Sequence, residues 1–265
     1  MKVTKLLPTF LLLQLSFALR IHNRIIGGQI CAETEHPWLV WISDSKGLYC
    51  SGVVINQDWV LTAAHCYVSS GMHLKFGLHN REVPREGVQL RTSTEAKCYP
   101  DTASSDSNSC ARSTITDDIM LVKLNAPVDY NDNVQPAILP TTVPKEGTEC
   151  KVMGWGSITT PEETYPLVPY CVYIEIFNDQ VCEAAYEPWW KTNGKVLCAG
   201  VLDGGKDSCR GDSGGPLMCG DELQGILSFG SYPCAKPLEP GVYAKVKSYL
   251  FWIQSIISEN TPETA

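Results

Sequence analysis

The chain has 265 residues, of which 44% are hydrophobic and 19% are charged, and its 21 basic and 29 acidic residues give a formal net charge of −8. This length suits one large domain or two small domains that share an interface. The acidic balance argues against nucleic acid or heparin as a partner, but it leaves cationic peptides as candidate substrates.

Residues 1–18 have the features of a secretory signal peptide. Lys2 and Lys5 give a positive start, residues 6–15 are mostly apolar, and residues 16–18 include small side chains suited to cleavage. A membrane anchor is the alternative, but the apolar run is well short of the roughly 20 residues that a membrane span needs. We therefore expect a secreted protein without a membrane partner.

Residues 19–24 then form a short activation propeptide that ends at Arg24, and residues 25–265 form the mature chain. Four of the 21 basic residues and no acidic residue precede Ile25, so 17 basic and 29 acidic residues remain, a net charge of −12. All twelve cysteines also lie in the mature chain. An even number of cysteines behind a signal peptide indicates disulfides, and the absence of paired Cys-x-x-Cys clusters disfavours the alternative of a zinc site.

Short runs of Val, Ile, Leu, Tyr and Trp alternate with turn residues along the mature chain and predict an all-β sandwich or barrel. Strands are predicted at 38–42, 52–55, 58–61, 121–124, 151–155 and 224–229. The C-terminal segment differs because Tyr249, Trp252, Ile253 and Ile256 recur at steps of three and four residues. This spacing predicts an amphipathic helix.

Three segments carry side chains that suit nucleophilic catalysis, in the order His65, Asp118, Ser213. His65 is a candidate base, Asp118 precedes an apolar strand and is a candidate to orient that base, and Ser213 lies among glycines that leave its hydroxyl accessible. Each has an ordinary alternative: a histidine beside a disulfide, a carboxylate at a strand end, and a polar tight turn. The other histidines lack such flanks and are interpreted as surface or structural side chains.

The segment around Ser213 offers two further features. The N–H groups of Gly211 and Ser213 can point to one side and form a hole for an oxyanion. Asp207 offers a negative charge to a cationic substrate side chain, with a solvated loop acid as the alternative.

These segments resemble the chymotrypsin-clan serine proteases of the trypsin and kallikrein type, whose catalytic residues follow the same chain order. The motifs that carry the resemblance are Arg24-Ile25-Ile26-Gly27-Gly28, Thr62-Ala63-Ala64-His65-Cys66, Asp118-Ile119-Met120-Leu121, Gly154-Trp155-Gly156, Gly211-Asp212-Ser213-Gly214-Gly215-Pro216 and Pro240-Gly241-Val242-Tyr243. Residues 98–118 and 252–257 look closer still to kallikrein-like proteases of reptile venoms, of the lizard gilatoxin and snake venom serine protease type.

The resemblance implies two six-stranded antiparallel β-barrels with a C-terminal α-helix outside them. It places His65 and Asp118 in the first barrel and Ser213 in the second. It also implies six disulfides in a single protease domain over residues 25–265. The implied pairs are Cys31–Cys171, Cys50–Cys66, Cys150–Cys219, Cys182–Cys198 and Cys209–Cys234, which leaves Cys98 to pair with Cys110.

The resemblance further implies a primary specificity pocket with Asp207 at its floor and Ser228, Gly230 and Gly241 along its walls. A carboxylate in such a pocket favours cleavage after Arg or Lys. Three features depart from the family: Phe229 stands where a Trp is usual, Tyr232-Pro233 adds bulk at the pocket entrance, and residues 98–118 form a longer segment than in a minimal trypsin.

The same resemblance predicts a zymogen. Cleavage after Arg24 would free the α-ammonium of Ile25, which would pair with the carboxylate of Asp212 and order the oxyanion loop. No metal or other cofactor is expected, because the acidic ligands of trypsin's calcium loop are not matched around residues 78–88.

The leading interpretation is a secreted, monomeric endopeptidase that acts as a kallikrein-like venom toxin on plasma proteins such as kininogen or fibrinogen. Its partners are then proteins and peptides with Arg or Lys before the cut bond, together with macromolecular protease inhibitors. A digestive trypsin is one alternative. A catalytically inactive homologue that acts by binding is another.

Overall fold

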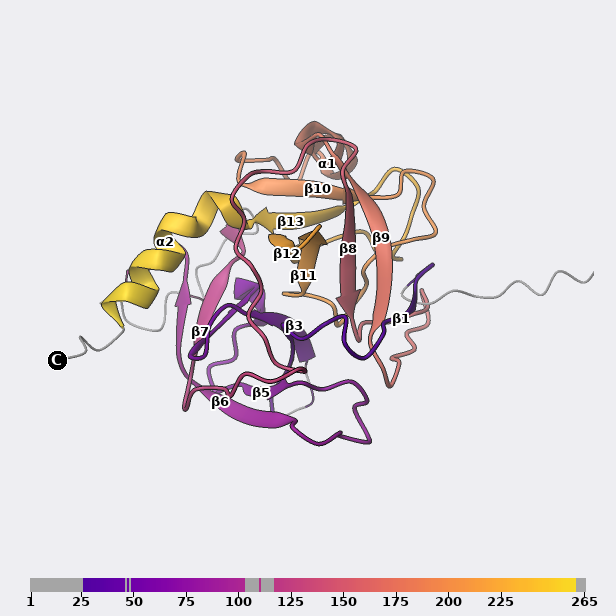
Figure 1. The fold of residues 1–265 in the computed structure, drawn as a ribbon. Helices are drawn as coiled ribbons and strands as arrows, with labels where there is room; N and C mark the ends of the chain where they lie inside the picture. The colour runs from indigo at the N-terminus through magenta and orange to yellow at the C-terminus, as the bar shows by residue number, and fades with distance from the viewer. Residues whose placement is uncertain (1–25, 46, 48, 103–109, 111–116, 261–265) are drawn as a thin grey trace, which may run out of the picture.

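The computed structural model describes residues 26–45, 47, 49–102, 110 and 117–260 (Figure 1). The predicted signal peptide (1–18) and propeptide (19–24), including Arg24, together with Ile25, lie outside the described residues. Most of the segment between Cys98 and Asp118 also lies outside them.

Six antiparallel strands close the first barrel in the order β2-β3-β4-β7-β6-β5. The strands are β2 (Leu39–Ser43), β3 (Tyr49–Val54), β4 (Trp59–Thr62), β5 (His73–Phe76), β6 (Gln89–Cys98) and β7 (Met120–Leu124). Val40, Leu61, Leu74 and Leu121 are fully buried inside it. These apolar and β-branched side chains suit the pleated surface of a strand whose inner face is dry.

The second barrel is closed by the pairing of β8 with β9 and has the order β9-β10-β13-β12-β11-β8. Its strands are β8 (Glu149–Gly154), β9 (Tyr170–Phe177), β10 (Val196–Gly200), β11 (Pro216–Cys219), β12 (Glu222–Phe229) and β13 (Gly241–Lys245). The short strand β1 (Gln29–Ile30) pairs with β9 on the outside. The two barrels lie one above the other in Figure 1.

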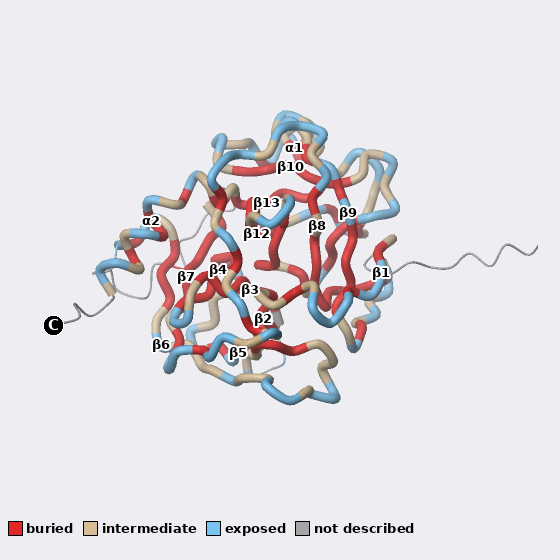
Figure 2. The backbone as a smooth tube through the Cα atoms, in the orientation of Figure 1, coloured by how far each residue is buried: buried red, intermediate tan, exposed pale blue. Residues whose placement is uncertain are grey.

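Two α-helices lie outside the barrels. Helix α1 (Asp179–Tyr186) begins after Asn178, whose side-chain Oδ1 accepts a hydrogen bond from Gln180 N at 3.0 Å. Helix α2 (Val246–Glu259) follows β13 and crosses to the first barrel, where Trp252 Nε1 donates to the carbonyl oxygen of Asp101 at 2.7 Å. Figure 2 shows the buried backbone concentrated in the barrels and the exposed backbone in the loops and on the outer side of α2.

These elements confirm the predicted fold class of two six-stranded antiparallel barrels with a C-terminal helix. Each predicted strand corresponds to an observed one, with ends that differ by up to three residues. The sequence patterns missed several strands, including β6, whose polar sequence shows little hydrophobic alternation. β6 forms because both of its edges pair, with β5 and with β7.

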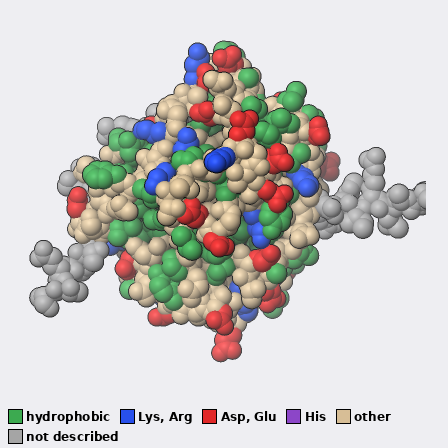
Figure 3. Space-filling view, turned by 45° about the horizontal axis from the view of Figure 1, so that its top comes forward, with side chains coloured by type: hydrophobic (Ala, Val, Ile, Leu, Met, Phe, Trp, Pro, Cys, Tyr) green, Lys and Arg blue, Asp and Glu red, His purple; other side chains and the backbone are tan. Residues whose placement is uncertain are grey.

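All six disulfides join the cysteines that the resemblance implied, and no cysteine of the described chain is free. Cys50–Cys66 and Cys209–Cys234 flank the segments that carry His65 and Ser213. Within the described part of the chain, no helix is both long and apolar enough to cross a membrane. On the face seen in Figure 3, Lys and Arg side chains are scattered among Asp and Glu side chains.

Candidate active site

His65 and Asp118 are brought together by the pairing of β4 with β7. Thr62, the last residue of β4, lies opposite Met120, the first residue of β7, in an antiparallel register. The residues just after β4 and just before β7 therefore meet at one end of the barrel. His65 N donates to Asp118 Oδ1 at 2.9 Å, and His65 Nδ1 lies 2.7 Å from Asp118 Oδ2.

This geometry selects one form of the His65 ring. Asp118 is buried and its Oδ2 can only accept, so the neutral ring carries its proton on Nδ1 and leaves Nε2 as a free acceptor. The side chain of His65 is 43% exposed, so a ligand can reach that acceptor. The pair can accept a proton and then hold the resulting imidazolium beside a carboxylate.

Ser228 of β12 adds a third hydrogen bond to Asp118. Its Oγ donates to Asp118 Oδ2 at 2.6 Å and so connects the second barrel to the carboxylate of the first. A buried carboxylate is costly unless hydrogen bonds compensate for the lost water. The sequence suggested Ser228 only as a pocket wall, and no local pattern indicated this second contact.

Ser213 lies in the turn between the Cys209 disulfide and β11, against the segment that carries His65. Its carbonyl oxygen accepts from Ser51 N at 2.7 Å and lies 3.8 Å from Cys66 Sγ. The next residue, Gly214, has φ +76°, and a side chain there would overlap Thr62. In the described part of the chain, Ser213 Oγ makes no hydrogen bond, to His65 or to any other group.

The backbone around Ser213 presents free donors. Gly211 has φ +96°, which glycine adopts without strain. The N–H groups of Gly211 and Ser213 have no acceptor among the residues that the structure describes. Two unoccupied N–H groups beside a serine suit the binding of a developing oxyanion.

A pocket of about 280 Å³ opens beside Ser213. The lining includes Arg210, Ser213, Ser228, Gly230, Ser231 and Tyr232. A side chain at Gly230 would begin 3.9 Å from both Asp207 Oδ2 and Gly241 Cα. Gly230 therefore leaves open space next to the Asp207 carboxylate, whereas a side chain at Gly241, which is not part of the pocket lining, would contact Tyr243.

The carboxylate of Asp207 is buried without a cationic partner among the described residues. Burial raises its pKa to about 7, although hydrogen bonds from Ala235 N and Ser208 oppose the shift. A cationic group in the pocket would restore its ordinary acidity. The arrangement is therefore suited to a ligand that carries a guanidinium or an ammonium.

Asp212 is buried beside the oxyanion loop and is held by backbone donors. Its Oδ1 accepts from Gly156 N at 2.7 Å and its Oδ2 accepts from Cys209 N at 3.0 Å. Side chains at Gly154 or Gly156 would overlap this carboxylate, which explains the two glycines around Trp155. Burial raises the pKa of Asp212 to about 6.

The described start of the chain lies close to Asp212. Ile26 forms an antiparallel bridge with Asp207, whose N–H donates to the Ile26 carbonyl at 3.1 Å. A small void next to Asp212 is lined by Val152, Met153 and Ser208, among others. The structure thus brings Ile26 to the loop that carries Asp212, while Arg24 and Ile25 lie outside the described residues.

Two of the remaining histidines form an internal pair. His36 is buried, its ring stacks on His79 with centroids 5.2 Å apart, and His36 Nε2 lies 3.0 Å from His79 Nδ1. A separate group of side chains, Cys50, His65 and Cys66, has the spacing of metal ligands. Its sulfurs form a disulfide, so they do not supply thiolate ligands.

Phe229, which stands in place of a Trp, lies in a cluster of aromatic side chains. Its ring centroid is 5.2 to 5.5 Å from those of Tyr186, Trp189 and Trp190. Of this cluster only Phe229 belongs to the pocket lining, together with the exposed Tyr232.

Known proteins are similar to this chain over its whole length. The family model described as Trypsin matches residues 25–253. The chain is 49% identical over 264 residues to the alpha- and beta-fibrinogenase OhS1 of Ophiophagus hannah, covering 100% of this chain and 98% of that protein. It is 46% identical to the serine protease harobin of Hydrophis hardwickii, with 98% of each chain covered. It is 45% identical to the thrombin-like enzyme saxthrombin of Gloydius intermedius, with 100% and 99% covered.

The family match and these full-length relatives agree with the double-barrel fold. The chain therefore belongs to the trypsin family of serine proteases and is an enzyme similar to the serine proteases of snake venoms.

Proposed function

We propose that this protein is a secreted serine endopeptidase that cleaves peptide bonds after Arg or Lys. The observation that carries the proposal is the buried Asp207 carboxylate, which has no cationic partner among the described residues and lies beside the pocket that Ser213 lines. A basic substrate side chain would neutralise this carboxylate and place the following peptide bond at Ser213. Gly230, which lines the pocket, leaves room for a long side chain next to the Asp207 carboxylate.

The proposed reaction has two halves. His65 Nε2 takes the proton of the Ser213 hydroxyl while Oγ forms a bond to the carbonyl carbon, and the N–H groups of Gly211 and Ser213 bind the oxyanion. The C–N bond then breaks as His65 returns the proton to the leaving amine. Water repeats these steps on the acyl-enzyme and releases the new carboxylate together with Ser213. Asp118 holds the His65 ring throughout.

Activation is part of the proposal. Cleavage after Arg24 would free the ammonium of Ile25, the residue that precedes Ile26 in the sequence, and Ile26 forms a bridge with Asp207. The carboxylate of Asp212 has two backbone donors and no charged partner among the described residues. An ammonium beside it would offset the cost of its burial and stabilise the loop that bears Gly211.

Fibrinogen or kininogen is the proposed class of natural substrate. The names of the relatives from Ophiophagus hannah and Trimeresurus stejnegeri describe fibrinogenases, and that from Gloydius intermedius describes a thrombin-like enzyme. Secretion into venom would follow from the same similarity. The long segment between Cys98 and Asp118 favours this substrate class over a digestive role.

The test uses the secreted protein after activation, with Ser213→Ala as its control. Labelling by a fluorophosphonate probe together with faster hydrolysis of Arg-esters than of Phe-esters would support the proposal. Absence of labelling would favour the inactive, binding homologue. Incubation with fibrinogen, kininogen and casein separates limited cleavage of plasma proteins from general digestion.

A further inference from the structure

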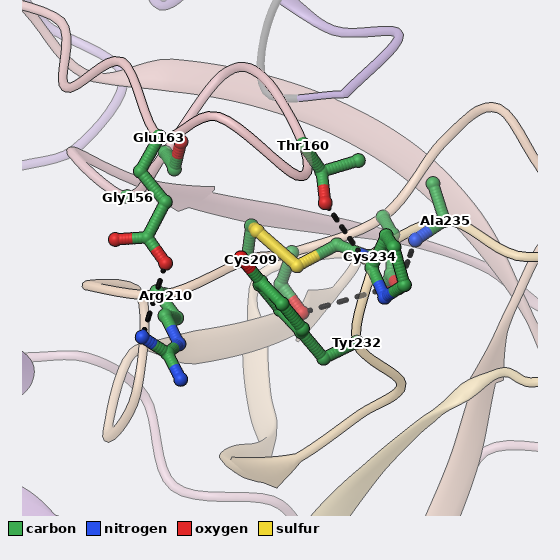
Figure 4. Close-up of a disulfide and its surroundings, with 12 residues drawn as sticks. Gly156, Thr160, Glu163, Cys209, Arg210, Tyr232, Cys234 and Ala235 are labelled. Atoms are coloured by element: carbon green, nitrogen blue, oxygen red, sulfur yellow. Dashed lines mark hydrogen bonds and ion pairs between the residues drawn. A yellow bond between two sulfur atoms is a disulfide. The ribbon is translucent and has the colours of Figure 1, made fainter.

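Arg210 lies at the mouth of the Ser213 pocket and has no role in the proposed reaction. It follows Cys209, precedes the oxyanion residue Gly211 and belongs to the pocket lining. Its side chain is 65% exposed, and Nη1 lies 3.1 Å from Glu163 Oε1. Figure 4 shows Arg210 and Glu163 pointing toward each other beside the Cys209–Cys234 disulfide.

The aromatic ring of Tyr232 packs against the guanidinium group of Arg210. The Arg210 guanidinium carbon lies 4.8 Å from the centroid of the Tyr232 ring, within the range of a cation–π contact. The Tyr232 hydroxyl donates to the carbonyl oxygen of Pro161 at 2.8 Å. The bulk that Tyr232 adds at the pocket entrance therefore serves as a platform for a positive charge.

Two more contacts join the segment before Glu163 to the pocket rim. Cys234 N donates to Thr160 Oγ1 at 3.2 Å, and Ser157 N donates to the carbonyl oxygen of Arg210 at 2.8 Å (Figure 4 draws the first). Glu163 and Arg210 are thus held on two segments that are bound to each other. Their ion pair lies beside the path of a substrate that enters the pocket.

The pocket region carries charges of opposite sign at two depths. Asp207 is buried next to Gly230 of the pocket lining, and Arg210 is an exposed residue of that lining. The Arg210 side chain is 65% exposed and that of Glu163 is 22% exposed, so water reaches the pair. A surface ion pair of this kind contributes only about 0–1 kcal/mol, and a carboxylate of a bound substrate can therefore replace Glu163 at little cost. The guanidinium fork suits such a carboxylate.

We propose that Arg210 is a specificity-determining residue that favours substrates with an acidic residue close to the scissile Arg or Lys, and that Glu163 competes with that acidic residue. The inference rests on the proposed cleavage after basic residues. The preferred peptides therefore carry a basic side chain for Asp207 and a carboxylate within a few residues of it for Arg210.

The test measures kcat/KM on fluorogenic peptides with a single Arg at the cut bond. Glu or Gln is placed in turn at each of the two positions before and the two positions after that Arg. For the activated enzyme we expect a Glu-to-Gln ratio of about two to five at one of these positions or more, the factor that an exposed ion pair supplies. The ratio should fall toward one when salt is raised to about 1 M.

Three variants separate the roles. Arg210→Gln should bring the ratio to about one, Arg210→Lys should keep most of it, and Glu163→Gln should raise it above that of the unaltered enzyme. Lys236→Gln is the matched control, because Lys236 pairs with Glu239 at 3.5 Å outside the pocket lining. This control should leave the ratio unchanged.

The outcomes distinguish this inference from the proposal beneath it. Cleavage of the Arg peptides with the same ratio in Arg210→Gln as in the unaltered enzyme would overturn the role of Arg210 alone. A lower Glu-to-Gln ratio in Glu163→Gln would show that Glu163 positions Arg210. The inference that Glu163 competes with the acidic residue of the substrate would then be wrong. If the activated enzyme cleaves none of the Arg peptides, the proposed function itself fails.

Discussion

Ser228 and Asp118, which are 110 positions apart in the chain and belong to different barrels, lie within a hydrogen bond of 2.6 Å. The contact is made on the oxygen that also meets His65 Nδ1. The second barrel therefore takes part in holding the acid and base of the first. The same hydrogen bond therefore joins the two barrels and fixes the geometry of the candidate site.

Replacing Ser213 tests the nucleophile. Ser213→Ala should lower turnover on an Arg-ester by about a million-fold, because no other hydroxyl takes its place beside the free N–H groups. Ser248→Ala, at an exposed position of α2, serves as the control and should retain full turnover. A Ser213→Ala protein with more than a few per cent of the activity would refute the assignment.

Asp118 and Ser228 should differ in the size of their effects. Asp118→Asn should reduce kcat by about ten-thousand-fold, because an amide donor facing Nδ1 favours the wrong tautomer of His65. Ser228→Ala removes one donor and leaves the carboxylate in place, so we expect a loss of about ten- to a hundredfold. Equal losses from both variants would contradict this account.

Activation is tested at the two basic residues of the proposed propeptide. Arg24→Gln should yield a secreted, folded and inactive protein, because Ile25 would keep its peptide bond. Arg20→Gln is the control and should still be cleaved before Ile25. N-terminal sequencing and Arg-ester hydrolysis check both, and full activity in an uncut Arg24→Gln chain would overturn the prediction.

The specificity pocket should depend on pH through Asp207. Since burial raises the pKa of Asp207 to about 7, the free enzyme loses the negative charge of its pocket as the pH falls below that value. The ratio of kcat/KM for an Arg substrate to that for an uncharged substrate should fall with it, and this ratio isolates the pocket because both substrates use the same catalytic residues. Asp207→Ser should remove both the Arg preference and its pH dependence.

Acid stability should depend on His36. Burial, followed by repulsion from His79, lowers the pKa of His36 to about 4. The unfolded chain takes up a proton near pH 6.5 while the folded chain stays neutral, so stability falls as the pH drops from about 6.5 to about 4. The loss attributable to this group is on the order of 3 kcal/mol.

Thermal unfolding of matched variants checks this prediction. His36→Gln should show a shallower fall of Tm over the same pH range. His73→Gln, at an exposed position of β5, should follow the unaltered protein. Parallel curves for all three proteins would contradict the role of the buried pair.

The parts of the fold with local signals were predictable. The steps of three and four residues that predicted the C-terminal helix correspond to the buried residues Tyr249, Trp252, Ile253 and Ile256 of α2. β6 was missed because its sequence is polar, and only its two neighbours in the barrel explain it. The disulfide pairs followed from the resemblance to a family, since spacing alone leaves the pairing open.

The candidate site likewise contains residues that the sequence predicted and contacts that it did not. Motifs pointed to His65, Asp118 and Ser213, and to Asp207 as an acid for a basic side chain. They contained no signal for the hydrogen bond from Ser228 to Asp118, for the Arg210–Glu163 pair or for the stacked His36 and His79. These contacts join residues that are tens of positions apart, and no local pattern relates their side chains.

The amino-acid sequence by itself determined which chemical groups this protein carries, their order, and the periodicities that make strands and a terminal helix. Only the tertiary structure shows the second hydrogen bond that Asp118 receives from Ser228, the burial of Asp207 without a cation among the described residues, and the pairing of Arg210 with Glu163 beside the pocket. The physical reason is that strand register and disulfides bring distant segments within hydrogen-bonding distance. A charged group that is buried without a partner of opposite charge then favours the binding of a ligand that supplies one.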